Sequence, residues 1–224
     1  FPYTTLFRSL YFAMSYRRKR RKSTKGKSAY SMAKKALKIS KKISNQIEIK
    51  HYDLDFNGSQ NLDWNGLRIN LNVNIPQGLT DSQRVGDKIK MVGNRLHFGL
   101  FLNGNAQSLI RCILMYDKEN SIEFATDFLE VTGSTSVVYS PYDVDDRHRY
   151  TILHDKVYSM STGLVRRKFI NFSKKLNKTT QYEGGTTSIA KGILRLWIFS
   201  DNDSTLVNPP ELFNGYSRIW YQDS

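Results

Sequence analysis

The sequence predicts an all-β domain of two packed sheets, preceded by a basic, partly helical N-terminal arm. Residues 47–224 read as strands throughout, because apolar residues alternate with polar ones or form short runs, and no helical period lies between them. Thirteen Tyr, twelve Phe and three Trp lie almost wholly in this part, and aromatic residues favour strands. The charge is divided as well. Residues 14–50 carry 14 Lys or Arg and one acidic residue, whereas residues 51–224 carry 19 basic and 19 acidic residues.

Residues 1–13 are expected to be a non-native leader. Residues 1–9 resemble the conceptual translation of a sequencing-library adapter, and Met14 then reads as a natural start. A secretory signal is the competing interpretation, but Arg8 interrupts the apolar stretch and no clear small-residue cleavage site follows it. The sequence has no apolar segment as long as a membrane span, so we expect no membrane insertion.

The arm, residues 14–46, is expected to bind nucleic acid. Its centre is the run 17–22, six consecutive cations that cannot pack in a core without buried counter-charges and must lie in water or on a polyanion. A nuclear-localisation signal alone needs fewer charges, although the same residues can also engage a host nuclear import receptor. The candidate nucleic-acid-binding residues are Arg17, Arg18, Lys19, Arg20, Arg21, Lys22, Lys25, Lys27, Lys34, Lys35, Lys38, Lys41 and Lys42.

A helix is expected over about residues 29–44. At about 100° per residue, the apolar side chains fall on one side and the lysines on the other, as in a basic amphipathic helix. One face can then dock on protein while the other contacts phosphate. A membrane-surface helix is the alternative, but such a helix usually has large aromatic or leucine-rich anchors. The apolar residues here are Met32, Ala33, Ala36, Leu37, Ile39 and Ile43.

Eight strands are expected in the body, at residues 47–56, 67–75, 88–102, 109–116, 150–160, 164–172, 193–199 and 216–221. The runs 109–116 and 193–199 are apolar on both faces and should be central in their sheets. The apolar phase slips at His51, which predicts a β-bulge there. Turn residues at 103–105 and 161–163 predict two tight hairpins.

Three connecting segments, residues 117–147, 173–190 and 201–213, are longer than ordinary loops. They contain too many apolar residues to be simple solvated tethers. We therefore expect them to form contact surfaces between subunits. The apolar residues are Phe124, Phe128, Leu129, Val137, Val138, Tyr139 and Tyr142.

A series of short motifs follows the order of the expected strands. The motifs are Ile47-Glu48-Ile49-Lys50, Ile75-Pro76-Gln77-Gly78, Arg84-Val85-Gly86-Asp87-Lys88-Ile89, Arg111-Cys112-Ile113-Leu114-Met115-Tyr116-Asp117-Lys118, Tyr139-Ser140-Pro141, Arg149-Tyr150-Thr151-Ile152-Leu153-His154-Asp155-Lys156 and Ser217-Arg218-Ile219-Trp220-Tyr221-Gln222-Asp223. With these motifs, the Arg-rich start and the lysine/alanine helix, residues 14–224 resemble the capsid proteins of small circular Rep-encoding single-stranded DNA (CRESS-DNA) viruses. They are more distantly similar to the coat proteins of satellite plant viruses.

The resemblance implies more than strand periodicity, which does not by itself separate a jelly roll from another sandwich. It implies that residues 47–224 form an eight-stranded jelly-roll capsid domain. It also implies a homo-oligomeric icosahedral shell that packages single-stranded nucleic acid, here circular single-stranded DNA, through the arm. The protein would then be found in the virion and, during infection, in the host nucleus.

Candidate sites outside the arm are few. Cys112 is the only cysteine, which excludes an internal disulfide and a cysteine-rich metal site. Asp143, Asp145 and Asp146 could bind calcium at a subunit junction, but we favour an acidic loop that pairs with neighbouring arginines, Arg147 and Arg149. The four histidines have no metal-ligand spacing, and we expect them to be packing or interface residues. They are His51, His97, His148 and His154.

A second basic cluster follows the sixth expected strand or lies within it. It could line the genome-facing surface of a shell or pair with acidic residues of a neighbouring subunit. Its members are Arg166, Arg167, Lys168, Lys174, Lys175 and Lys178.

The leading functional hypothesis is a structural capsid protein with no catalytic site, metal or cofactor. The arm would neutralise packaged nucleic acid without reading its sequence, because cations on such an arm contact phosphates rather than base edges. The alternative is a non-viral nucleic-acid-binding β-sandwich protein with a basic tail. A third hypothesis, a jelly-roll enzyme or lectin, lacks a plausible acid/base pair or metal cluster.

Overall fold

The computed structural model describes residues 29–40, 48–103, 107–131, 137–202 and 209–224. The chain divides into two compact units, residues 1–47 and residues 48–224. In the ranges described, no helix has both the length and the apolar character that crossing a membrane requires.

Residues 29–40 form an α-helix inside the predicted range of about 29–44, of which residues 41–44 fall outside the described part. Every residue of this helix is exposed, including the apolar Tyr30, Met32, Leu37 and Ile39. The apolar stripe expected from the sequence is therefore an uncovered face of this helix.

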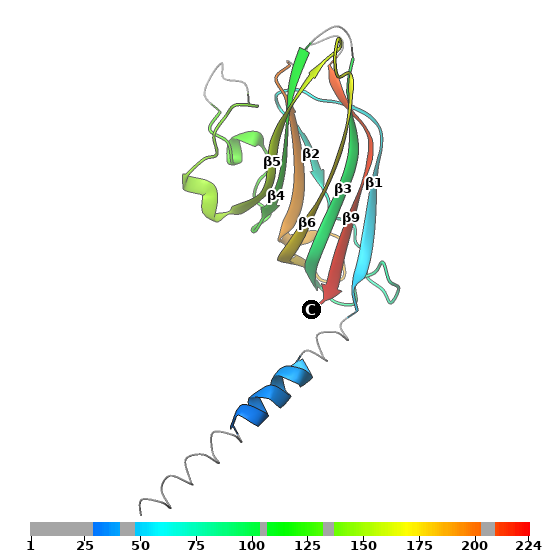
Figure 1. The fold of residues 1–224 in the computed structure, drawn as a ribbon, viewed down its shortest axis with the longest axis vertical. Helices are drawn as coiled ribbons and strands as arrows, with labels where there is room; N and C mark the ends of the chain where they lie inside the picture. Colours follow the sequence, from blue (N-terminus) through cyan, green and yellow to red (C-terminus); the bar gives the residue numbers. More distant parts are fainter. Residues whose placement is uncertain (1–28, 41–47, 104–106, 132–136, 203–208) are drawn as a thin grey trace, which may run out of the picture. The chain divides into compact units, whose positions relative to one another are not determined.

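Nine strands form two antiparallel sheets in the described part of the second unit (Figure 1). The strands are β1 (Lys50–Asn61), β2 (Leu67–Asn70), β3 (Lys88–Leu102), β4 (Gln107–Asp117), β5 (Tyr150–Ser161), β6 (Arg167–Tyr182), β7 (Ile189–Lys191), β8 (Ile193–Ser200) and β9 (Pro210–Asp223). The five-stranded sheet has the order β1-β9-β3-β6-β7, and the four-stranded sheet has the order β2-β8-β4-β5.

The order of strands is that of a jelly roll. Only β4 with β5 and β6 with β7 are consecutive strands that pair with each other. Every other connection crosses from one sheet to the other. The predicted jelly-roll sandwich is thus confirmed, with the short β7 added at the β6 edge.

The two predicted hairpins are wrong. β3 and β4 flank residues 103–105 but lie in different sheets, and so do β5 and β6, which flank residues 161–163. A tight turn does occur at the second place, where the Val165 amide donates to the Ser161 carbonyl at 2.8 Å. Turn residues signal a change of direction, but they do not say which strand the chain pairs with afterwards.

Several strand boundaries differ from expectation: β2 ends at Asn70 rather than at residue 75, β9 begins at Pro210 rather than at residue 216, and β1 and β6 differ for reasons that their pairing shows. The predicted bulge at His51 is wrong, because β1 pairs with β9 in unbroken register from Lys50 to Phe56 and shifts only between Phe56 and Ser59. The residue that caused the apparent slip, Ile49, lies before the strand and is exposed. β6 continues to Tyr182, ten residues beyond its predicted end at residue 172, because β3 pairs with it as far as Gln181.

The main core lies between the two sheets. β3 contributes Leu96, Phe98 and Leu100 to it, and β4 contributes Cys112 and Leu114, all of them buried. β8 is buried at every position and β4 at nearly every position, as their two-sided apolar runs predict. Both strands therefore need cover on the outer face of their sheet as well.

The described residues of the segment 117–149 provide that cover and form a second core with residues of β4, β5 and β8 (Figure 1). Phe128 is fully buried and packs on Trp197 and Phe199 of β8, with ring centroids 5.5 Å and 6.3 Å away. The interpretation of this segment as a contact surface between subunits is wrong for its buried members. These are Phe128, Leu129, Val137 and Val138, whereas Phe124 and Tyr139 remain exposed.

Candidate nucleic-acid interface

The arm cations are only partly within the described residues. Lys34, Lys35 and Lys38 lie on the helix 29–40 and are exposed. The other candidates of the arm lie outside the described residues. They are Arg17, Arg18, Lys19, Arg20, Arg21, Lys22, Lys25, Lys27, Lys41 and Lys42.

The second basic cluster does not form one patch, because the alternation of β6 sends its members to opposite faces. Lys168 and Lys178 turn toward the other sheet, where their ammonium groups lie 5.3 Å from the Tyr158 ring centroid and 5.2 Å from that of Tyr116. Lys174 occupies an inward-facing position of the same alternation in β6. Burial, followed by the positive charges of Lys174 and Lys156, lowers the pKa of His154.

Arg167 and Lys175 lie on the opposite, outward face of the five-stranded sheet. Arg167 pairs in register with Phe101, and Lys175 with Gly93. The neighbouring Arg166 donates from Nε to the Leu102 carbonyl at 3.3 Å, and its guanidinium lies 5.1 Å from the Phe101 ring centroid.

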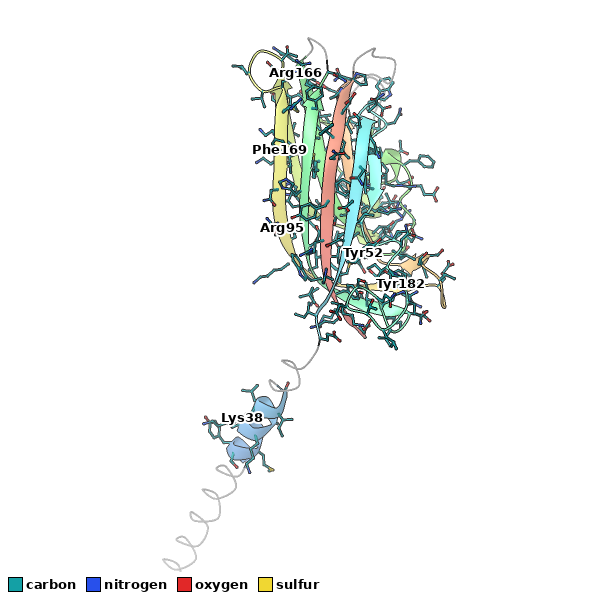
Figure 2. All side chains as sticks on the ribbon, turned by 90° about the vertical axis from the view of Figure 1, so that its right-hand side faces the viewer. Lys38, Tyr52, Arg95, Arg166, Phe169 and Tyr182 are labelled. Carbon is teal, nitrogen blue, oxygen red and sulfur yellow. The ribbon has the colours of Figure 1, made fainter. Side chains whose placement is uncertain are left out.

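This outward face carries further cations that the cluster in the sequence did not include. Lys88, Lys90 and Arg95 of β3 are exposed and alternate with buried residues such as Ile89 and Met91. The alternation in residues 88–91 was a signal that could have placed both lysines on the outer face. Figure 2 looks onto this face, on which Arg95 and Phe169 are labelled.

A row of three rings crosses the same face. Phe169 of β6, His97 of β3 and Tyr216 of β9 lie on adjacent strands, and His97 pairs in register with Tyr216. The His97 centroid lies 6.4 Å from that of Phe169 and 5.8 Å from that of Tyr216, with interplanar angles of 16° and 29°. We refer to these residues as the ring row.

Several buried cations of the body are paired with carboxylates. Arg195 and Asp117 form a fully enclosed pair, with Nη2 and Oδ2 3.1 Å apart. Arg111 donates to both oxygens of Asp155, at 3.0 Å and 2.7 Å. Tyr142 donates to Asp155 as well, at 2.6 Å. Burial alone would raise the pKa of Asp155, but the hydrogen bonds from Arg111 and Tyr142 lower it overall.

The acidic loop has an internal arrangement of its own. Asp146 forms an ion pair with Arg149 at 2.9 Å, and Asp143 accepts a hydrogen bond from the Asp145 amide at 2.8 Å. Among the residues that the structure describes, no three His, Cys, Asp or Glu side chains are grouped as metal ligands would be.

The histidines lie against other side chains or backbone. His154 stacks on Phe172 with centroids 4.3 Å apart, and His97 belongs to the ring row. His51 pairs in register with Trp220 across β1 and β9, and His148 Nδ1 lies 3.1 Å from the Asp145 carbonyl oxygen. Cys112 is buried in the main core, and burial raises the pKa of its thiol.

Comparison with known proteins identifies the family. The family model for the Satellite tobacco necrosis virus coat protein matches residues 14–200. No curated protein matches the sequence.

Solved structures show weaker likenesses, all with TM-scores below 0.5. Desmodium yellow mottle tymovirus shares 10% identity at a TM-score of 0.38, over 79% of this chain and 88% of that one. Dimeric latent PorU from Porphyromonas gingivalis shares 9% identity at a TM-score of 0.32, over 79% of this chain and 13% of that one. Infectious bursal disease virus, Gt strain, shares 7% identity at a TM-score of 0.24, over 80% of this chain and 38% of that one.

The family match covers most of the chain and agrees with the more distant of the two resemblances drawn from the sequence. The chain therefore belongs to the Satellite tobacco necrosis virus coat protein family: it is a structural protein of the virion that assembles with further copies of itself into a capsid, and it is not an enzyme.

Proposed function

We propose that this coat protein builds an icosahedral shell and packages circular single-stranded DNA through its basic arm. The observation that carries the proposal is the division of charge. Residues 14–50 have a net charge of +13, whereas residues 51–224 have a net charge of zero. A neutral jelly roll can associate by burying apolar surface, while the arm neutralises the phosphates of the cargo.

The division also predicts how the two kinds of contact respond to salt. Each neutralised phosphate of a single strand releases counterion, so the logarithm of affinity falls with a slope of about −0.7 per contact. If every one of the 13 net charges engaged, the slope would reach roughly −9 per subunit. Apolar burial between subunits is not screened by salt. Rising salt should thus release the cargo before it dissolves the shell.

The test is oligonucleotide binding to dissociated subunits, measured against the logarithm of salt concentration. Replacing Arg17, Arg18, Arg20 and Arg21 with Ala should reduce the slope by up to about three units. The matched control replaces the same four residues with Lys, which keeps the charge and should keep the slope. A slope unchanged by the alanine variant contradicts the proposal. So does a strong sequence preference that both variants lose, because the arm would then read bases.

The identity of the cargo and the nuclear stage rest on the resemblance to CRESS-DNA viruses. Cargo extracted from particles should be degraded by DNase and resist RNase, and the reverse result would make it RNA. The run 17–22 also supports recognition by a host nuclear import receptor. Residues 14–27 fused to a fluorescent protein should then accumulate in the nucleus, and a cytoplasmic fusion would remove this part of the proposal.

A further inference from the structure

The outward face of the five-stranded sheet exposes apolar rings that no described segment of residues 48–224 covers, and Phe169 among them is labelled in Figure 2. Phe169 has 73% of its surface exposed and Phe213 has 53%. A single exposed phenylalanine is common on protein surfaces. Here Phe169 belongs to the ring row on three adjacent strands, and Phe213 lines the same pocket as Phe169, so the exposed rings are grouped on this face.

Between these rings lies a pocket of about 190 Å³. Its floor is Gly99, which pairs in register with Phe169. Phe101, Phe169 and Phe213 stand around it. A Cβ on Gly99 would come no closer than 3.5 Å to the Phe169 ring, so the glycine leaves room above the sheet without being required by its neighbours.

The ring row holds Phe169 in place before any ligand arrives. His97 lies nearly parallel to Phe169, at 16°, and Tyr216 lies on the far side of His97 from β6. A ring that is already ordered loses little conformational entropy when a planar group stacks on it.

The cations around the pocket indicate the charge of the ligand. Arg167 lies on the pocket rim, and Arg95 and Lys175 lie further along the same face on β3 and β6. In the described ranges none of these three has a carboxylate within ion-pair distance, whereas the enclosed Arg111 and Arg195 each have one. Unpaired cations beside exposed rings fit a ligand that is both anionic and aromatic.

The carboxylate that lines the pocket, that of Glu211, already has hydrogen-bond partners within the body. Glu211 accepts hydrogen bonds from Asn103 Nδ2, at 2.5 Å, and from the Ser59 hydroxyl. On the far edge of the face, Asp53 pairs with Arg218 through two bonds of 2.7 Å and 2.6 Å, and the hydrogen bond from Arg218 lowers the pKa of Asp53. A third acidic residue, Asp55, is exposed on the same face and lies in register with Tyr216 on the edge strand β1, away from the pocket. None of these carboxylates lies within ion-pair distance of Arg167, Arg95 or Lys175 in the described ranges, so these cations can contact phosphate.

We propose that this face is a second nucleic-acid site on the body, at which a base of the packaged single strand stacks on Phe169 in the pocket above Gly99. Arg167, Arg95 and Lys175 contact the phosphates on either side. The inference rests on the proposed function, because it takes a single-stranded genome as the ligand. It adds a contribution to binding that depends on bases but not on their sequence, since every base has a face that can stack.

The experiment uses the full chain as dissociated subunits and compares two probes of equal length, oligo-dT and the same phosphodiester strand without bases. The wild type should prefer oligo-dT. Phe169→Ala should reduce that preference by roughly 5-fold to 100-fold per engaged base, while the salt slope stays unchanged. Phe169→Trp should retain it. The matched control is Phe124→Ala, which removes another exposed ring, 66% exposed, that lies in the segment covering the other sheet.

A second variant keeps every ring. Gly99→Val fills the floor of the pocket, and valine suits a strand, so the preference should fall as it does for Phe169→Ala. Photocrosslinking of a 5-iodouracil strand should mark peptides of β6 or β3. Adducts confined to other peptides overturn the proposal.

The remaining outcomes separate the inference from the function on which it rests. If wild type binds both strands equally, the arm still holds the phosphates and only the stacking site is refuted. If wild type binds neither strand, the proposed function fails and the site fails with it. If Phe169→Ala impairs particle assembly while base preference is unchanged, the face is a contact between subunits and the proposal is wrong.

Discussion

Both sheets of the jelly roll carry aromatic residues on their outer faces, but among the described residues of 48–224 only one of these faces is covered. The face of β2-β8-β4-β5 carries Trp197 and Phe199, and the segment 117–149 buries both. The face of β1-β9-β3-β6-β7 carries the ring row, and no described segment of residues 48–224 lies on it (Figure 2). The cations differ in part as well. Arg111 and Arg195 are paired under cover, whereas on the bare face Arg218 is paired but Arg95 and Lys175 have no carboxylate within ion-pair distance among the described residues. Aromatic strands that stabilise the fold on one side are thus left available for a ligand on the other.

The largest predicted effect is the loss of the enclosed ion pair under the covering segment. Asp117→Ala leaves the buried Arg195 without a carboxylate and removes the acceptor of the Ile122 and Glu119 amides. We expect a loss of about 4 to 5 kcal/mol in the free energy of unfolding. Urea unfolding of dissociated subunits measures it.

The matched control is on the bare face. Asp53→Ala breaks the exposed pair with Arg218 and should cost no more than about 1 kcal/mol. Equal losses for the two variants would show that cover makes no difference to these ion pairs.

A slightly smaller effect is expected for the ring at the centre of the covered face. Phe128→Ala opens a cavity against Trp197 and should cost about 3 to 4 kcal/mol. Phe169→Ala, on the bare face, should change the unfolding free energy by less than about 0.5 kcal/mol. Thermal and urea unfolding of the two variants test the contrast, and a large loss for Phe169→Ala would mean that the bare face is structural.

The network of Arg111, Asp155 and Tyr142 should make a smaller contribution to the free energy of unfolding, and this contribution should depend on pH. The folded pKa of Asp155 is lowered, so its stabilisation is complete above the unfolded value of 3.8 and is lost as the pH falls through the folded value. Asp155→Asn should cost about 1 to 2 kcal/mol at pH 7. The difference from wild type should begin to shrink as the pH falls below about 4, where Asp155 of the unfolded chain takes up a proton, and should vanish once the pH lies below the lowered folded pKa. A difference that stays constant down to pH 2 would contradict this account.

The smallest effect on stability is expected where cations are unpaired. Replacing Arg95 and Lys175 together with Ala should change the unfolding free energy by less than about 0.5 kcal/mol. The same double variant should flatten the salt slope of oligonucleotide binding by about 1.4 units, from two lost phosphate contacts. A stability loss without a change in slope would indicate that these residues pair with another subunit.

Periodicity was a reliable guide where a strand has one buried face or two. The expected range 88–102 coincides with β3, and the runs 109–116 and 193–199 became the central strands β4 and β8. β6 was cut short because residues 173–182 are mostly polar, and only Leu176, Thr180 and Tyr182 turn inward to full burial. Such sparse burial is hard to distinguish from a loop by composition.

Pairing between distant segments could not be predicted. The hairpins failed because the turn after Ser161 leads into the other sheet. The segment 117–147 was assigned to subunit contacts because its apolar residues indicate burial but do not indicate which surface buries them. The candidate interface was found only in part, since the second basic cluster was read as one patch while alternation divides it, and Arg95 was not among the candidates. Of the two resemblances, the satellite coat is confirmed by the family match, and CRESS-DNA stays a prediction.

The position of β9 sets the order in which the body can be completed during synthesis. β9 lies between β1 and β3 and pairs with both, although it follows them by more than a hundred residues. Until β9 leaves the ribosome, β1 and β3 each have an open edge, and such edges promote aggregation. The five-stranded sheet is therefore completed late, and it is completed through contacts between residues far apart in the sequence. Such contacts make folding slow. The basic arm, residues 14–46, precedes this domain in the sequence, so its cations are already synthesised while the domain that forms the shell is still incomplete.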